Sequence, residues 1–195
     1  MEESAQAFRG HMQRAISLLN LHIQYQENAN DPAFLKKLRM RMELLAEALP
    51  LAARASERMT TMAETFAAAE GIIARIYDPD GRNTCIYTLD DRSVDQPTLA
   101  TLGQIFAEFL SNIYSRATPE NAPRRVEVKF SADAGQGRLR VRDAAAASTE
   151  PLDQLTVRVI GELARSLDGA ARFDGSNIHD AELTFRSPAS PTGSP

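Results

Sequence analysis

Two polar residues on one predicted helix are the best candidates for chemistry in this chain. Glu108 and Asn112 lie in residues 101–112, a segment that is otherwise mostly apolar. Residues four apart share one face of a helix, so both side chains can reach the same point. A carboxylate beside an amide can order a metal ion and a water there, which is one way to handle a nucleotide phosphate. The alternative is a surface pair at the edge of a core helix.

Size and composition indicate what could position such a pair. The chain has 195 residues, of which 43% are hydrophobic, enough for one domain of ordinary size and a smaller module. It has a net charge of −4, no polybasic block, no Trp and only 6% aromatic residues. These values argue against a nucleic-acid partner and against an anionic membrane surface. We therefore expect neither a nucleic-acid partner nor a membrane partner.

Cysteine content and the N-terminus bear on the cellular compartment. Cys85 is the single cysteine, which excludes an intrachain disulfide framework and a multi-cysteine metal site, and we expect it to act as a small buried hydrophobe. The N-terminus lacks the basic start and apolar run of a signal peptide. The sequence also lacks a run of about 18 apolar residues, the length needed to cross a bilayer. We expect a reduced, cytoplasmic protein.

The N-terminal third predicts a helical hairpin over residues 1–66. Apolar residues recur at spacings of three and four in 8–23 and again in 35–49, and the stretch 27–32 between them is polar. Two antiparallel helices cannot bury wide apolar stripes alone, so we expect a four-helix bundle formed by a homodimer. Docking of the hairpin on the C-terminal half of its own chain is the alternative.

Residues 67–187 mix strand and helix patterns, and residues 188–195 are a Ser/Pro-rich stretch expected to be a disordered tail. The order β-β-α-β-β-α-β-β predicts an α+β sandwich with helices on one face of the sheet. Strands are predicted at 71–77, 84–88, 125–130, 139–143, 171–173 and 182–186, and helices at 98–116 and 152–167.

Several motifs, in this order, give the chain a resemblance to a known family. They are Ser-Leu-Leu-Asn-Leu at 17–21, the helix at 102–112, Arg-Leu-Arg-Val-Arg-Asp at 138–143, and the helix and strand at 160–173. Over about residues 5–186 the chain resembles the core of two-component sensor histidine kinases, most closely the HWE-like subgroup. The resemblance implies dimerisation helices followed by a Bergerat-like ATPase fold, an α/β sandwich. It also implies that Glu108 is the base, Asn112 a Mg²⁺ ligand, and Asp143 the group that reads adenine.

The chain departs from this family at the phosphoacceptor. Counting back from the 17–21 motif, the family's histidine falls on Gln6. An amide cannot accept and pass on a phosphoryl group as an imidazole nitrogen does. His11 lies five residues later and is the candidate phosphoacceptor if the helix register is read differently. The alternative, for His11 as for His22, is an ordinary histidine on a polar helix face.

The chain also departs from the family in the segments that would bind the nucleotide. After Asp143 the family has a glycine-rich turn, and this chain has four alanines at 144–147. Each alanine adds a Cβ where positive φ or close backbone approach is needed. Where a Gly-Thr-Gly is expected, residues 176–180 read Ser-Asn-Ile-His-Asp. We therefore expect little affinity for a triphosphate, with Asn112 and Asp143 as vestigial nucleotide-binding residues.

These departures predict a degenerate histidine-kinase-like protein of two-component signalling. We expect a homodimer that either transfers phosphate or binds and regulates a response-regulator receiver domain, without ATP turnover; dimeric histidine phosphotransferases resemble this plan. Receiver docking is expected at Arg9, His11 and Arg14, for which a solvated helix face is the alternative.

Two other functions stay open. One is a divergent but active ATP-dependent histidine kinase that works through Glu108, Asn112 and Asp143. The other is a non-catalytic dimeric adaptor. We expect no resident cofactor; ATP and Mg²⁺, the latter held by Asn112, would be required only by an active kinase.

Overall fold

The chain divides into two compact units, Met1–Thr60 and Thr61–Pro195. The computed structural model describes residues 37–43, 61–90, 94–116, 122–133, 135–144, 154–173 and 180–186. In the first unit, residues 37–43 are helical, and Arg39 Nε donates a hydrogen bond to Glu43 Oε1 at 2.7 Å.

Most of the predicted hairpin lies outside the described residues. This applies to the phosphotransfer and docking candidates Arg9, His11 and Arg14, to His22, and to Gln6, where the family has its phosphoacceptor. The hairpin, the four-helix bundle, the homodimer and the domain boundaries at residues 66 and 187 remain predictions.

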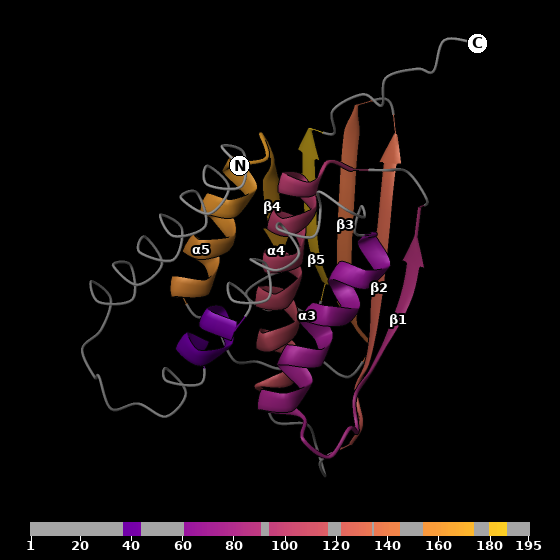
Figure 1. The fold of residues 1–195 in the computed structure, drawn as a ribbon, viewed down its shortest axis with the longest axis vertical. Coiled ribbons are helices and arrows are strands. Elements are labelled where there is room, and N and C mark those ends of the chain that lie inside the picture. The colour runs from indigo at the N-terminus through magenta and orange to yellow at the C-terminus, as the bar shows by residue number, and fades with distance from the viewer. Residues whose placement is uncertain are drawn as a thin grey trace, which may run out of the picture. The chain divides into compact units, whose positions relative to one another are not determined.

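The second unit is built on a five-stranded mixed sheet with the strand order β1-β2-β3-β5-β4 (Figure 1). Strand β1 runs parallel to β2, and the other neighbouring strands are antiparallel. The strands are β1 (Thr84–Leu89), β2 (Arg125–Asp133), β3 (Gln136–Asp143), β4 (Ala170–Phe173) and β5 (Asp180–Arg186).

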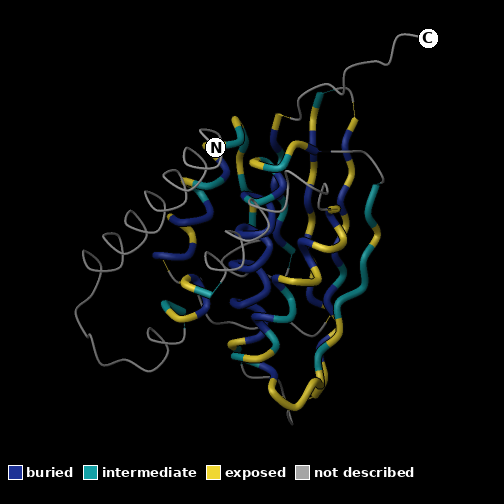
Figure 2. The backbone as a smooth tube through the Cα atoms, viewed as in Figure 1, coloured by how far each residue is buried: buried dark blue, intermediate teal, exposed yellow. Residues whose placement is uncertain are grey.

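Three helices pack on one face of this sheet: α3 (Met62–Tyr77), α4 (Gln96–Tyr114) and α5 (Gln154–Arg165) (Figure 1). Burial alternates along β2 and β3, as Figure 2 shows, because successive side chains of a strand point to opposite faces. The helices cover one face, and the outward positions that the structure describes on the other face are exposed or half-buried. The prediction of an α+β fold with helices on one face of a sheet is confirmed.

The central helix, α4, is buried on all sides. Asp95 caps its N-terminus, where its carboxylate accepts a hydrogen bond from the Thr98 backbone N–H at 2.8 Å. Every residue from 101 to 114 is buried. Close packing against α3 depends on Gly103, where an added Cβ would lie 2.8 Å from Thr65 Cγ2.

One predicted strand is wrong: residues 71–77 form the second half of α3. A capping box between Thr61 and Glu64 starts this helix, and an alanine-rich turn propagates it through Gly71. Its buried residues include Phe66, Ala69 and Ile73, which recur at the spacing of a helix face. A short apolar run is compatible with a strand or a helix, and here it continues a helix that has already begun.

Cys85 on β1 is half-buried, whereas we expected it to be fully buried. Its Sγ lies 3.6 Å from the Tyr114 hydroxyl. Burial raises the pKa of the thiol to about 12, so Cys85 stays protonated at neutral pH. Cys85 is therefore a small, neutral side chain at neutral pH, although it is less buried than expected.

Candidate functional site

Glu108 and Asn112 share one turn of α4, as their spacing predicts. Both are buried, with 2% and 4% of their surface exposed. The Asn112 side-chain amide donates a hydrogen bond to the Glu108 backbone carbonyl at 2.9 Å, and Ser111 Oγ donates to the same carbonyl at 3.1 Å. The Asn112 amide nitrogen thus binds the backbone of its own helix.

Asp143 lies at the C-terminal end of β3, on the face of the sheet that the helices cover. It follows Leu139 and Val141 at alternate positions, and all three are buried. The Asp143 side chain is only 1% exposed. A carboxylate at this depth requires a strong hydrogen-bond donor or a cation.

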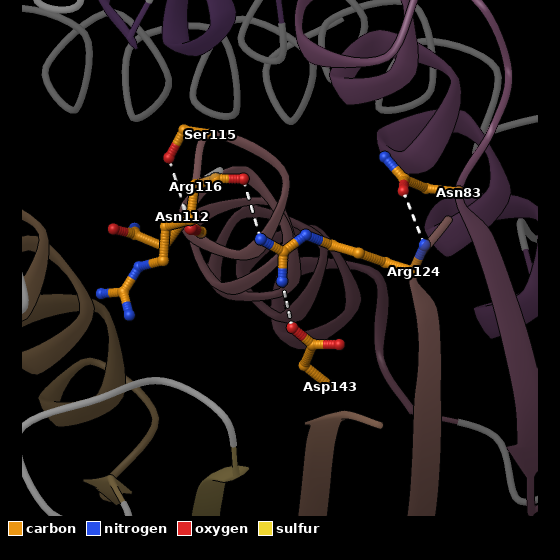
Figure 3. Close-up of polar contacts among 6 residues, drawn as sticks. All are labelled: Asn83, Asn112, Ser115, Arg116, Arg124 and Asp143. Atoms are coloured by element: carbon orange, nitrogen blue, oxygen red, sulfur yellow. Dashed lines mark hydrogen bonds and ion pairs between the residues drawn. The ribbon is translucent and has the colours of Figure 1, made fainter. Parts of the chain in front are cut away.

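The cation is Arg124, which sequence analysis did not single out. Its guanidinium Nη1 forms an ion pair with Asp143 Oδ2, and the Arg124 side chain is only 4% exposed (Figure 3). Nη2 donates to the backbone carbonyl of Arg116 at 2.8 Å. The guanidinium therefore joins the end of β3 to the chain just beyond the C-terminus of α4, where helix carbonyls attract positive charge.

The alternation of β2 explains why Arg124 points inward. Arg124 precedes the strand, and it shares parity with the buried Val126 and Val128. In the register of the sheet, Val126 pairs with Asp143. Arg124 and Asp143 therefore lie on the same face at the ends of neighbouring strands. The sequence contained a signal for this pair, because Arg124 stands two residues before Val126 and so continues the alternation of buried positions.

A chain of hydrogen bonds fixes the backbone at Arg124. The Asp78 carboxylate, at the end of α3, accepts from the backbone N–H groups of Arg82 and Asn83 at 3.0 and 2.7 Å. Asn83 Oδ1 in turn accepts from the Arg124 backbone N–H at 3.0 Å (Figure 3). The end of α3, the start of β1 and the start of β2 are thus tied together, which positions the buried guanidinium.

Known structures share this fold, although no family model and no curated protein sequence matches the chain. The chain is similar to the Erythrobacter litoralis EL346 blue-light activated histidine kinase, with a TM-score of 0.72 and 18% identity over 97% of this chain and 61% of that one. It is also similar to the histidine kinase domain of the same protein, with a TM-score of 0.56 and 18% identity over 90% of this chain and 94% of that domain.

The chain has the fold of a histidine kinase. At 18% identity the likeness extends to the fold alone, and the chain spans about three fifths of the length of the light-activated kinase. No helix within the described ranges is long and apolar enough to cross a membrane.

Two residues that the resemblance assigns to ATP and Mg²⁺ have other partners in the structure. The Asp143 carboxylate, expected to accept from the adenine amino group, already accepts from a charged guanidinium. The Asn112 side chain, expected at the metal, is buried, and its amide nitrogen is hydrogen-bonded within α4. Among the residues that the structure describes, no group of three or more His, Cys, Asp and Glu side chains could hold a metal ion.

Proposed function

We propose that this chain is a two-component signalling protein whose kinase-like domain does not use ATP. It acts as a dimer that binds a receiver domain, either relaying phosphate or regulating the receiver. The proposal rests on the histidine kinase fold together with the ion pair between Arg124 and Asp143.

The ion pair carries the proposal because adenine would have to displace it. A nucleobase amino group is a neutral donor, and the guanidinium that it would replace is charged and makes stronger hydrogen bonds. Displacing the guanidinium would also break a buried ion pair, which is costly in a protein interior. The loss would exceed what one neutral hydrogen bond returns.

The residue after Asp143 supports the same conclusion. The Ala144 backbone N–H donates to the Arg125 carbonyl at 2.9 Å, which extends the pairing of β3 with β2 by one residue. A glycine-rich turn that approaches a nucleotide needs its backbone N–H groups for the ligand. Here the first of them is used by the sheet, and the sequence supplies alanines at the three positions that follow.

The experiment that tests the proposal has two arms on the full chain. In the first, calorimetry with Mg²⁺ and ATP is expected to show no binding at millimolar nucleotide, and labelled ATP is expected to leave no acid-labile label. In the second, a receiver domain carrying labelled phosphoaspartate is mixed with the chain. Label that moves to the chain and is lost in His11→Ala identifies a relay; stable binding without label identifies a regulator.

An active kinase is the second candidate, and the position of Glu108 and Asn112 on one turn of α4 favours it. Micromolar affinity for ATP that requires Mg²⁺ and is lost in Asp143→Ala would establish nucleotide binding and reject the proposal. Absence of both ATP binding and receiver binding would leave a dimeric adaptor, which also contradicts the proposed signalling role.

A further inference from the structure

The face of the sheet opposite the helices carries a concentration of positive charge. We call it the outer sheet face and define it by the outward positions of β2, β3, β4 and β5 together with those of β1. Its cations outnumber its acids by seven to four, although the whole chain has a net charge of −4. The cations are Arg125, Lys129, Arg138, Arg140, Arg142, Arg172 and Arg186, all exposed, and the acids are Glu127, Asp133, Asp180 and Glu182.

A row of three arginines on β3 forms the centre of this face. Arg138, Arg140 and Arg142 occupy alternate positions, so their Cα atoms are about 7 Å apart and their side chains leave the same side of the sheet. The side chains of Arg138 and Arg140 are 56% and 47% exposed. Because β3 is the middle strand, the row lies at the centre of the face, away from its edges.

Some of these charges are already paired. Two nitrogens of Arg140 donate hydrogen bonds to the Asp180 carboxylate, and Nε lies 2.6 Å from Oδ1. Hydrogen bonding to Arg140 lowers the pKa of Asp180. Arg138 Nε lies 3.9 Å from Glu182 Oε2, which is a weak contact. Within the described part of the chain, no carboxylate makes an ion pair with Arg125, Arg142, Arg172 or Arg186. The face therefore retains arginines that can bind further carboxylates.

We propose that the outer sheet face binds an acidic protein surface, independently of the proposed phosphate chemistry. Six of its seven cations are arginine, whose planar guanidinium matches a carboxylate with two parallel hydrogen bonds. The pair between Arg140 and Asp180 shows this geometry within the same face. Acids interspersed among the arginines would also pair with lysines of a protein partner.

The same face suits nucleic acid and membranes less well. Its outward positions carry no aromatic side chain on which a base could stack, and its four acids would repel phosphates. Only Ile86 and Ala170 among these positions are apolar, so little could insert into a lipid interface. Discrete carboxylates on a protein fit the mixed charge pattern best.

The test uses fluorescence anisotropy with the full chain and a labelled peptide of alternating Glu and Ser. The variant R138T/R142T replaces two arginines of the outer sheet face with threonine, a residue that favours β-strands. The matched control R75Q/R158Q removes two exposed arginines from α3 and α5, and thus the same charge, and replaces them with a helix-favouring residue. At about 50 mM salt we expect the face variant to bind about tenfold more weakly and the control to bind within about twofold of the parent.

Three results would overturn the proposal. The first is an equal loss in the control, since affinity would then follow net charge only. The second is tighter binding of a single-stranded oligonucleotide, or of phosphatidylserine vesicles, than of the acidic peptide. The third is no peptide binding at low salt. Thermal unfolding of both variants within about 2 °C of the parent, as expected for exposed substitutions, confirms that folding is intact.

Discussion

Replacing Arg124 by leucine should destabilise the second unit severely. The guanidinium is 4% exposed and its carboxylate partner 1% exposed, so water cannot replace the lost cation. Removing one member of a buried ion pair costs about 3–5 kcal/mol, because the other charge stays buried and loses that partner. The hydrogen bond to the Arg116 carbonyl adds about 1 kcal/mol. For a domain of this size the melting temperature should fall by about 10–20 °C.

A double variant separates the ion pair from simple packing. In R124L/D143L both charges are gone, and apolar residues of similar volume commonly replace a buried pair without loss. We expect the double variant to recover to within about 1 kcal/mol of the parent, whereas D143L alone leaves a buried arginine and is also costly. Urea unfolding followed by far-UV circular dichroism measures all four proteins, since the chain has no Trp.

Two outcomes would refute this reasoning. If R124L lowered the free energy of unfolding by less than about 1 kcal/mol, the ion pair would be hydrated in solution and would not occupy Asp143 tightly. Strictly additive losses in the double variant would mean that the two side chains act separately. In either case the ion pair could not be the obstacle to nucleotide binding.

Three further predictions concern two helix glycines and Cys85. Gly103→Ala should cost about 1–3 kcal/mol because its Cβ would meet Thr65 at 2.8 Å, whereas Gly71→Ala, with open space around it, should be neutral or stabilising; chemical denaturation compares them. The Cys85 thiol, with a pKa near 12, should react with a disulfide reagent at pH 8 about a thousandfold more slowly in the native than in the unfolded chain. Between pH 8 and 10 the unfolded thiol ionises and the folded one does not, so stability should fall by about 2 kcal/mol, and the loss should be smaller in a Cys85→Ala variant.

The two long antiparallel strands were predicted from the sequence pattern alone. The alternation of apolar and charged residues gave β2 and β3 because one face of each strand is buried and the other is not. The spacing of Glu108 and Asn112 placed them on one turn of a real helix. The strand predicted at 71–77 failed because seven residues carry too little periodicity to override a helix that begins at a cap ten residues earlier.

The ion pair was harder to foresee. Arg124 and Asp143 are 19 residues apart, and only the pairing of Val126 with Asp143 brings them together. Their partnership depends on a register that no local pattern fixes, although the parity of Arg124 with the core positions was visible. The docking positions Arg9, His11 and Arg14 lie outside the described residues, so their roles remain predictions.

The enclosure of α4 changes how loss-of-function variants can be interpreted. Asn112 stabilises its own helix, and every residue from 101 to 114 contributes to the interior. A variant such as Asn112→Ala that fails in a signalling assay could have lost its fold and not a reaction. Activity measurements on variants of this helix therefore carry mechanistic meaning only when unfolding curves accompany them. Substitutions of the exposed arginines are easier to interpret, because they disturb the fold less.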